Sequence, residues 1–226
     1  MYVFEAMGET TPNYSAFDSS KWIENEVQKN RSHSDGVRDD HILLVRALSS
    51  VRSAHILDFG GSLGAAYAAL QSAYPDRDFR YTIVETPAVC AAGRDYHKTS
   101  DIFFTEKISD LKKIDVVYVQ TSLQYARNWR ETLNTLIDLA PSIFILSHAS
   151  VGDIRTFQAI QNYYERKIPY WWISISDLKE VFSTHGYACA IDEEDQAIHD
   201  SAFCESIAAD DRLRATRNLI FRRILS

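Results

Sequence analysis

The sequence predicts an α/β protein built on a doubly wound, mostly parallel sheet of seven strands. Two observations lead to this fold class. Five short β-rich runs between residues 55 and 147 alternate with helical segments, and this βα order is typical of a parallel sheet with right-handed crossovers. The stretch "HILDFGGSLGAAYAAL", residues 55–70, passes from an apolar run through three glycines into an alanine-rich segment, which is the pattern of a strand, a tight turn and a helix.

Five strands are predicted from runs that are nearly continuous in apolar residues, as a sheet covered on both faces requires. The runs are "HILDFG", "RYTIVE", "IFFT", "DVVYVQ" and "SIFILS". Two further runs, 187–192 and 218–225, have no obvious helical crossover between them, so we expect an antiparallel hairpin at the edge of the sheet.

Helices are predicted from apolar spacing and from start and stop signals. Two precede the first strand, and Pro141 ends the last helix between strands. The predicted ranges are 18–30, 38–51, 62–74, 87–97, a short one at 107–112, 128–140, 151–165 and 176–185. We expect one compact domain, in which a helical segment, 1–52, packs on a core formed by 53–226.

Composition and charge exclude several classes of partner. The formal net charge of -7, without a Lys/Arg cluster longer than a pair, gives no footprint for nucleic acid. The longest apolar runs fall short of the roughly 20 residues that a membrane span needs, so we expect a soluble, cytoplasmic protein. The three cysteines and the scattered histidines lack metal-ligand spacing, and no metal is predicted. The sequence leaves a homodimer open.

The glycine loop allows two interpretations. Gly60, Gly61 and Gly64 lie where backbone N–H groups and a helix N-terminus can approach a ligand, but a sharp turn alone also needs glycine. Glu85 ends the second predicted strand, 21 residues after Gly64, where a carboxylate can accept hydrogen bonds from both ribose hydroxyls. Together the loop and the acid predict a cofactor that carries an adenosine.

The spacing of the loop separates two such cofactors. Asp58 to Gly64 follow D-x-G-x-x-x-G rather than the dinucleotide pattern G-x-G-x-x-G. An acid beside a pyrophosphate would be badly placed, whereas Asp58 can anchor the cationic amino group of S-adenosylmethionine (SAM). Asp58 can also serve only to brace the loop.

These residues resemble the class I SAM-dependent methyltransferases, through "ILDFGGSLG", "YTIVE", "DVVYVQTSLQYARNW" and "NLIFRR". More narrowly, "LDFGGSLG", "VQTSLQY", "IPYWWIS" and the C-terminal "FRR" resemble a methyltransferase family associated with bacterial surface-polysaccharide and O-antigen gene clusters. The resemblance implies a Rossmann-like methyltransferase fold and SAM as cofactor. Ser62 departs from the glycine usual in the class, and we expect its hydroxyl to cap the following helix.

The resemblance also implies further site residues. Glu106, after the third strand, corresponds to a position that contacts the adenine edge, and Gln120 to one beside the methionine end of the cofactor. The loop after Gln120, which contains Gln124 and Tyr125, should form the floor of the acceptor pocket.

A hydroxyl or amine acceptor must also lose a proton. His148 follows the fifth strand run and is the candidate base, although a hydrogen-bonded loop histidine is the favoured interpretation of the residue taken alone. Tyr125 is a candidate for positioning the acceptor. The segment "YWW", 170–172, is either a pocket wall or core, and the acidic stretch 192–200 either selects a polar or cationic acceptor or is solvated surface.

The function predicted from the sequence is therefore a SAM-dependent methyltransferase that O-methylates a sugar or another small polar metabolite. A catalytically silent SAM-binding or scaffold subunit is one alternative. An NAD-dependent oxidoreductase is another, disfavoured by the glycine spacing.

Overall fold

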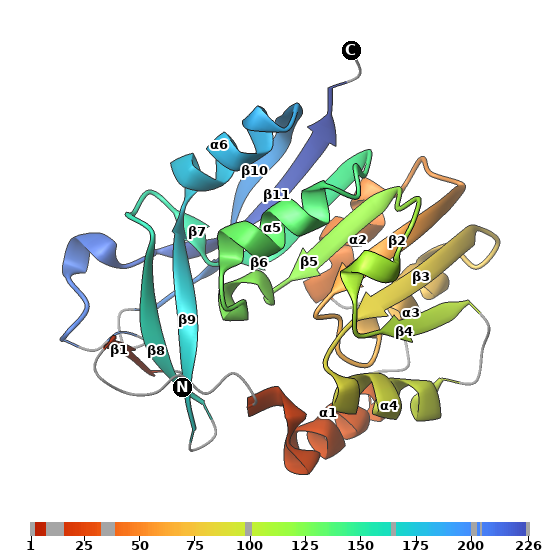
Figure 1. Cartoon of the computed structure of the whole chain (residues 1–226), viewed down its shortest axis with the longest axis horizontal. Coiled ribbons are helices and arrows are strands. Elements are labelled where there is room, and N and C mark those ends of the chain that lie inside the picture. The colour runs from red at the N-terminus through yellow and green to blue at the C-terminus, as the bar shows by residue number, and fades with distance from the viewer. Residues whose placement is uncertain are drawn as a thin grey trace.

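The large sheet of the protein has seven strands, in the order β10-β11-β6-β5-β2-β3-β4 (Figure 1). The computed structural model describes residues 3–7, 16–32, 39–97, 101–163, 166–199, 203 and 205–224. The strands are β2 (Ser53–Phe59), β3 (Asp78–Val84), β4 (Ile102–Thr105), β5 (Val116–Gln120), β6 (Ile143–Ala149), β10 (Tyr187–Ala197) and β11 (Ala215–Arg223). β2 lies between β3 and β5 and pairs in parallel with both, so the chain order reverses there, where open sheets bind ligands.

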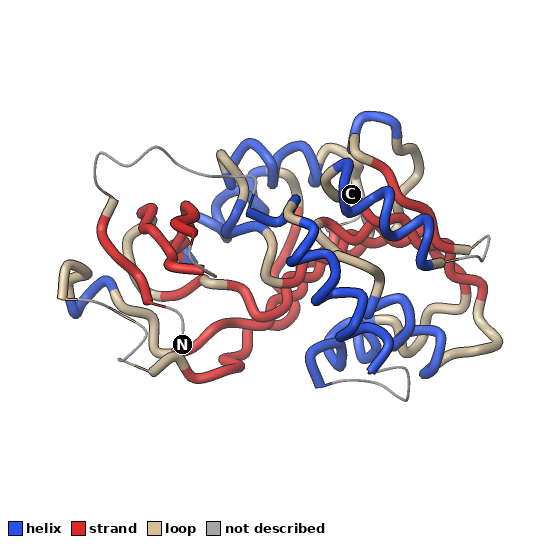
Figure 2. Tube along the Cα trace, turned by 90° about the horizontal axis from the view of Figure 1, so that it is seen from below, coloured by secondary structure: helices blue, strands red, loops and turns tan. Residues whose placement is uncertain are grey.

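Helices cover both faces of this sheet, and the strands form the layer between them (Figure 2). The sequence accounts for this, because strands such as β6 are buried along their whole length and need cover on each side. Helices α2 (Ile42–Ala47), α3 (Ala65–Ala73) and α4 (Pro87–Tyr96) contribute to one core cluster, and α5 (Trp129–Ile137) and α6 (Ile175–Thr184) contribute to the other. The predicted doubly wound α/β fold is confirmed.

The antiparallel edge hairpin is also confirmed, and it is longer than predicted. β10 pairs with β11 from Tyr187↔Arg223 to Ala197↔Ala215, and β11 pairs antiparallel with β6. Most of the acidic stretch 192–200 therefore belongs to strand β10 and is not a loop. β10 is the edge strand of the sheet and is largely exposed. Acidic side chains can therefore occupy this strand while they stay in contact with solvent.

The predicted helix 151–165 is wrong, because this segment forms strands. β7 (Val151–Gly152) and β8 (Phe157–Tyr163) belong with β1 (Val3–Ala6) and β9 (Arg166–Ser174) to a second sheet, in the order β1-β8-β9-β7. β8 pairs antiparallel with the aromatic strand β9, for example Phe157↔Trp172 and Ala159↔Tyr170. Aromatic cross-strand neighbours stabilise such a hairpin, and they override the weak helical spacing of the segment.

The N-terminal part of the chain contains the strand β1 as well as helices. After the 3-10 helix η1 (Ala16–Asp18), α1 (Ser20–Ser32) lies beside α4 (Figure 1), and the 3-10 helix η2 (Asp39–His41) leads into α2. The predicted short helix 107–112 is a 3-10 turn, η3 (Ile108–Asp110). The division between 1–52 and 53–226 stays a prediction. Among the described residues, no helix has the length and apolar character that crossing a membrane requires.

Candidate functional site

The glycine loop is held in shape by close contacts with its own scaffold. Gly60 and Gly64 have φ angles of 72° and 83°, in the left-handed region that favours glycine. A Cβ atom on Gly61 would overlap the carboxylate of Asp58. Gly64 is the N-cap of α3, so the loop leads straight into the helix N-terminus.

Asp58 lies beneath this loop and does not line a cavity. Its side chain is 1% exposed, and Oδ2 accepts a hydrogen bond of 2.8 Å from the Tyr81 hydroxyl. Burial raises the pKa of Asp58 to about 7, although the Tyr81 bond acts in the opposite direction. The structure therefore places Asp58 as a brace for the loop, which was one of the two interpretations of the sequence.

Glu85 lies just beyond the end of β3, against the same loop. Its carboxylate accepts hydrogen bonds from the backbone N–H of Ser62 (3.1 Å) and from that of Thr86 (3.0 Å). Burial raises the pKa of Glu85, and the nearby carboxylates of Asp18 and Glu26 add to the increase. The carboxylate is thus fixed in direction, with an environment that favours a nearby cation or hydroxyl donor.

Ser62 does not cap α3, contrary to expectation. Its hydroxyl donates instead to Glu26 Oε2 on α1, at 3.1 Å, and the N-cap of α3 is Gly64 with no side-chain cap bond. The reason is that Ser62 has φ 50°, which turns its side chain toward α1. The serine that replaces the usual glycine therefore links the N-terminal helix to the loop.

A cavity of about 1020 Å³ opens beside the loop, between the two sheets. Pockets for drug-sized ligands measure roughly 300–1,000 Å³, so this cavity has room for a cofactor and an acceptor together. The predicted site residues that line it are Gly60, Ser62, Glu85, Glu106, Gln120, Tyr125 and His148. Asp58 beneath the loop, and Gly61 and Gly64 within it, are outside the lining.

Three of the five described non-glycine residues with positive φ line this cavity, and the other two, Lys113 and Ala140, lie elsewhere. Ser62, Thr121 and His148 have φ angles of 50°, 48° and 50°, and all three line the cavity. Non-glycine residues in this region cost about 1–3 kcal/mol each and cluster at functional sites. The fold holds these residues in place because their positions at the ends of β2, β5 and β6 are fixed by the sheet.

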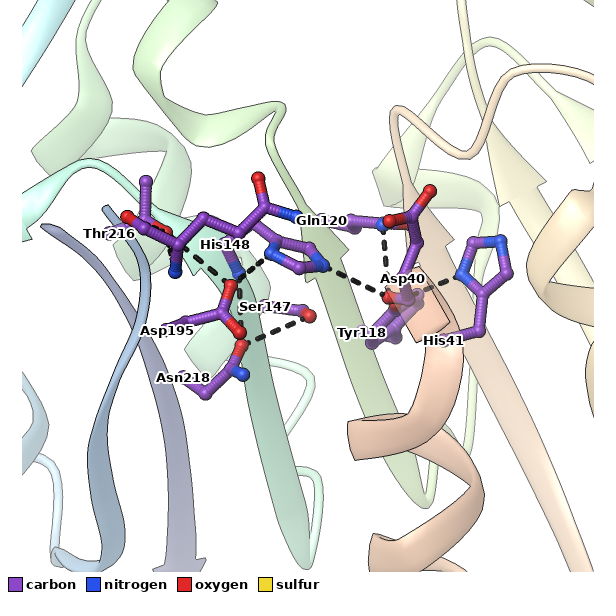
Figure 3. A network of polar contacts seen from close by, with 10 residues as sticks. Asp40, His41, Tyr118, Gln120, Ser147, His148, Asp195, Thr216 and Asn218 are labelled. Atoms are coloured by element: carbon purple, nitrogen blue, oxygen red, sulfur yellow. Dashed lines mark hydrogen bonds and ion pairs between the residues drawn. The ribbon is translucent and has the colours of Figure 1, made fainter. Parts of the chain in front are cut away.

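His148 lies at the end of β6, with its ring between two acceptor groups (Figure 3). Nδ1 pairs with the carboxylate of Asp195 on β10, and Nε2 lies 3.3 Å from the carbonyl oxygen of Asp40. Asn218 Oδ1 accepts hydrogen bonds from the His148 backbone N–H (3.1 Å) and from the Ser147 hydroxyl (3.2 Å). The edge hairpin therefore fixes both the backbone and the ring of His148.

The Asp40 carbonyl also accepts a hydrogen bond from the end of the neighbouring strand, β5. The side-chain amide of Gln120 donates to it at 3.1 Å, and the adjacent His41 ring lies 3.4 Å from the Tyr118 hydroxyl. The turn η2 therefore covers the ends of β5 and β6 (Figure 3). His148 Nε2 can reach a ligand once it leaves the Asp40 carbonyl.

The far wall of the cavity is aromatic and comes from the second sheet and the N-terminal segment. The Tyr125 ring packs 5.0 Å from Phe17 and 5.2 Å from Tyr170, measured between centroids. Tyr170 and Trp172 line the cavity, whereas Trp171 packs against the main core and donates to the Ala126 carbonyl. The segment "YWW" thus supplies both a pocket wall and core, which the sequence had offered as alternatives.

The cavity is acidic at the end where Glu85 lies. The carboxylates of Glu26, Glu85 and Glu106 line it, and none of the described lining residues is Lys or Arg. Such a lining favours a cationic ligand over one that carries phosphates.

Comparison with known proteins supports the fold. No protein-family model matches the sequence, and no curated protein matches it. Solved structures do match, and all of those compared below are methyltransferases or complexes that contain one.

One match is a chain of the complex between the Haloferax volcanii Trm112 methyltransferase activator and a methyltransferase, with a TM-score of 0.60, 15% identity and coverage of 95% of this chain and 99% of that chain. The chain has the fold of the SAM-dependent methyltransferases. Magnesium protoporphyrin IX methyltransferase from Synechocystis, solved with bound S-adenosylhomocysteine (SAH), shares this methyltransferase fold at TM-score 0.55, 14% identity and coverages of 96% and 90%. The sugar N-methyltransferase KedS8 from Streptoalloteichus also shares it, with a TM-score of 0.54, 13% identity and coverage of 97% of this chain and 99% of that chain.

Several residues of this site were missed from the sequence. Asp195 was considered only within an acidic stretch, and Gln161 was placed in a predicted helix. Phe17 and Trp22 line the cavity from the N-terminal segment. Residues 157–163 break the apolar–polar alternation of a strand at Ile160 and Gln161, so no local pattern indicated Gln161.

Proposed function

We propose that the protein is a SAM-dependent methyltransferase. The observation that carries the proposal is Glu85, whose carboxylate is buried, held by two backbone N–H groups and placed at the switch point of a methyltransferase-type sheet. A carboxylate at this place can accept hydrogen bonds from the two ribose hydroxyls of an adenosine. The residues present fit SAM: Glu85 would hold the ribose, Glu106 the adenine edge, and Gln120 would lie at the methionine end.

The charge of the lining supports SAM over a dinucleotide. SAM carries a cationic sulfonium and an ammonium group, whereas NAD carries a pyrophosphate. Glu85 favours the former, and so do Glu26 and Glu106, although these two also pair with cations outside the lining, Lys29 and Arg94. Among the described lining residues no Lys or Arg is present to neutralise the latter. Asp58 beneath the loop adds negative charge as its carboxyl ionises.

The acceptor is proposed to be a hydroxyl of a sugar or another small polar metabolite. When bound, SAM supplies an electrophilic methyl group. The protein aligns the two reactants in the cavity, and His148 takes the hydroxyl proton at Nε2 while Asp195 holds Nδ1. The resemblance to the surface-polysaccharide family and the fold shared with a sugar methyltransferase support a sugar acceptor. A cytoplasmic location and a homodimer are predictions that accompany this proposal.

Calorimetric titration with SAH tests the proposal. The wild-type protein is expected to bind SAH, and Glu85→Gln to bind it roughly 10- to 100-fold more weakly, because hydrogen bonds to a charged acceptor contribute about 1.5–3 kcal/mol. Glu180→Gln, the same substitution at an exposed position of α6 outside the cavity, is the matched control. Absence of SAH binding, or equal affinity of the two variants, would contradict the proposal. Tighter binding of NADH than of SAH would favour the oxidoreductase.

A further inference from the structure

Two buried glutamine amides face the acceptor end of the cavity. Gln124, in the 3-10 turn η4 (Leu123–Tyr125), is 4% exposed, and Gln161, on β8, is 3% exposed. Both line the cavity. Buried amides are normally hydrogen-bonded on both sides.

Neither amide is satisfied by the protein. In the described part of the chain, the side chain of Gln124 has no hydrogen-bond partner, and Gln161 has only one, the Tyr125 hydroxyl that donates to its Oε1 at 2.9 Å. Neither amide belongs to the fully enclosed, unpaired side-chain atoms of the described residues, so their polar atoms reach the open space of the cavity. The amide nitrogens of Gln124 and Gln161 therefore present donors to a ligand, and Gln124 Oε1 presents an acceptor.

The surfaces around these amides are aromatic and uncharged. Tyr125 and Tyr170 pack edge to face at 5.2 Å, and Tyr170 and Trp172 lie 5.1 Å apart. Rigid aromatic faces of this kind bind the flat faces of rings. The acids that line the cavity, Glu26 and Glu85 among them, belong to its cofactor end.

We infer that the acceptor is an uncharged ring that bears hydroxyl groups, recognised by the amides of Gln124 and Gln161 and by the aromatic wall. This inference rests on the proposed function and names its substrate class. Neutral amides donate to and accept from hydroxyls without compensating a charge. An anionic acceptor would meet glutamates with no described Lys or Arg in the lining, and a cationic acceptor would be repelled by the sulfonium that it must approach.

The inference separates two forms in which a sugar can arrive. A nucleoside-diphosphate sugar brings a diphosphate that this lining does not neutralise, whereas a sugar already joined to another molecule by a glycosidic bond is uncharged. A sugar acceptor is therefore of the second kind. The reaction class that supplies it is glycosyl transfer, in which the diphosphate leaves.

Calorimetry on the SAH-saturated protein tests the inference. The probes are a panel of methyl hexosides as neutral sugars, resorcinol as a neutral phenol, and UDP-glucose as the charged sugar. At least one neutral probe is expected to bind, with UDP-glucose at least tenfold weaker, and the stronger neutral probe identifies the ring as sugar or phenol. UDP-glucose binding as tightly as the best neutral probe, or no neutral probe binding, would overturn the inference.

Two variants connect this binding to the amides. Gln124→Ala and Gln161→Ala are each expected to weaken binding of the best neutral probe roughly 3- to 10-fold, as expected for loss of one or two neutral hydrogen bonds. SAH affinity should stay at the wild-type value. Gln28→Ala, on the exposed side of α1 and outside the lining, is the matched control. If both variants bind the probe as tightly as the wild type, the amides do not recognise the acceptor, even if SAH binds. This result would refute the inference and leave the proposed function standing.

Discussion

The buried carboxyl of Asp58 gives the protein a stability that depends on pH, and Asp58→Asn should remove that dependence. The pKa of Asp58 is about 7 in the folded protein, against an ordinary value of 3.8. Because the folded state holds the proton more tightly, the contribution of this group to stability is greatest at low pH and is lost as the pH rises toward 7. Asparagine carries no charge and can still accept the hydrogen bond from Tyr81.

The magnitude follows from the gap between the two pKa values. A gap of about three pH units corresponds to about 4 kcal/mol at 1.36 kcal/mol per unit. The free energy of unfolding of Asp58→Asn, relative to wild type, should rise by about 2.5 kcal/mol between pH 5 and pH 8, and most of this rise should occur below pH 7.

Urea denaturation at pH 5, 6, 7 and 8 measures this difference directly. Asp76→Asn, the same substitution at an exposed residue, is the control for the chemistry of the change. A difference between Asp58→Asn and wild type that stays constant from pH 5 to pH 8 would refute the reasoning, since the burial of Asp58 could not then be raising its pKa.

Three other predictions concern the loop and the dyad of His148 and Asp195. Gly61→Ala should destabilise the protein by about 1–3 kcal/mol in urea denaturation, because its Cβ overlaps the Asp58 carboxylate; unchanged stability would contradict the packing described. Asp195→Asn should lower kcat about 100-fold on the acceptor found by the probes and change the pH profile of kcat, while the affinity for SAH stays constant. An unaltered pH profile of kcat would leave Asp195 with a purely structural role. SAH affinity should fall as the pH is lowered through the pKa of Glu85, which burial raises; calorimetry across pH 4.5 to 8 checks this, and a flat profile would speak against Glu85 as the ribose ligand.

The sequence was most informative where local pattern and sheet position agree. The runs around β2, β3 and β5 are continuous in apolar residues, and a chain that alternates strands with helices brings their carboxyl ends to one edge. Glu85 follows directly from that geometry, without any knowledge of side-chain contacts, whereas the role of Gln120 was implied by the resemblance to the methyltransferases.

The parts that were missed depend on pairing between distant segments. β1 and β8 are adjacent only because the chain start meets residues 159–162 in a sheet, and no local spacing indicates this. Asp195 meets His148 because β10 and β11 fold back on β6. The predicted helix 151–165 failed for the same reason, since its aromatic partner on β9 decides its conformation.

Three of the four strands of the second sheet, β7, β8 and β9, come from one continuous stretch of the chain between β6 and α6. The loop that contains Gly60, and Glu85 beyond it, come from earlier segments and contact the cavity from the opposite side. Exchange of the cavity-facing residues of this stretch between homologues, with the core residues Val151, Trp171 and Ile173 kept, would alter the proposed choice of acceptor and leave the proposed cofactor half in place. Chimeras joined just after β6 and just before α6 are therefore a direct route to enzymes of new selectivity, and the same economy is open to evolution.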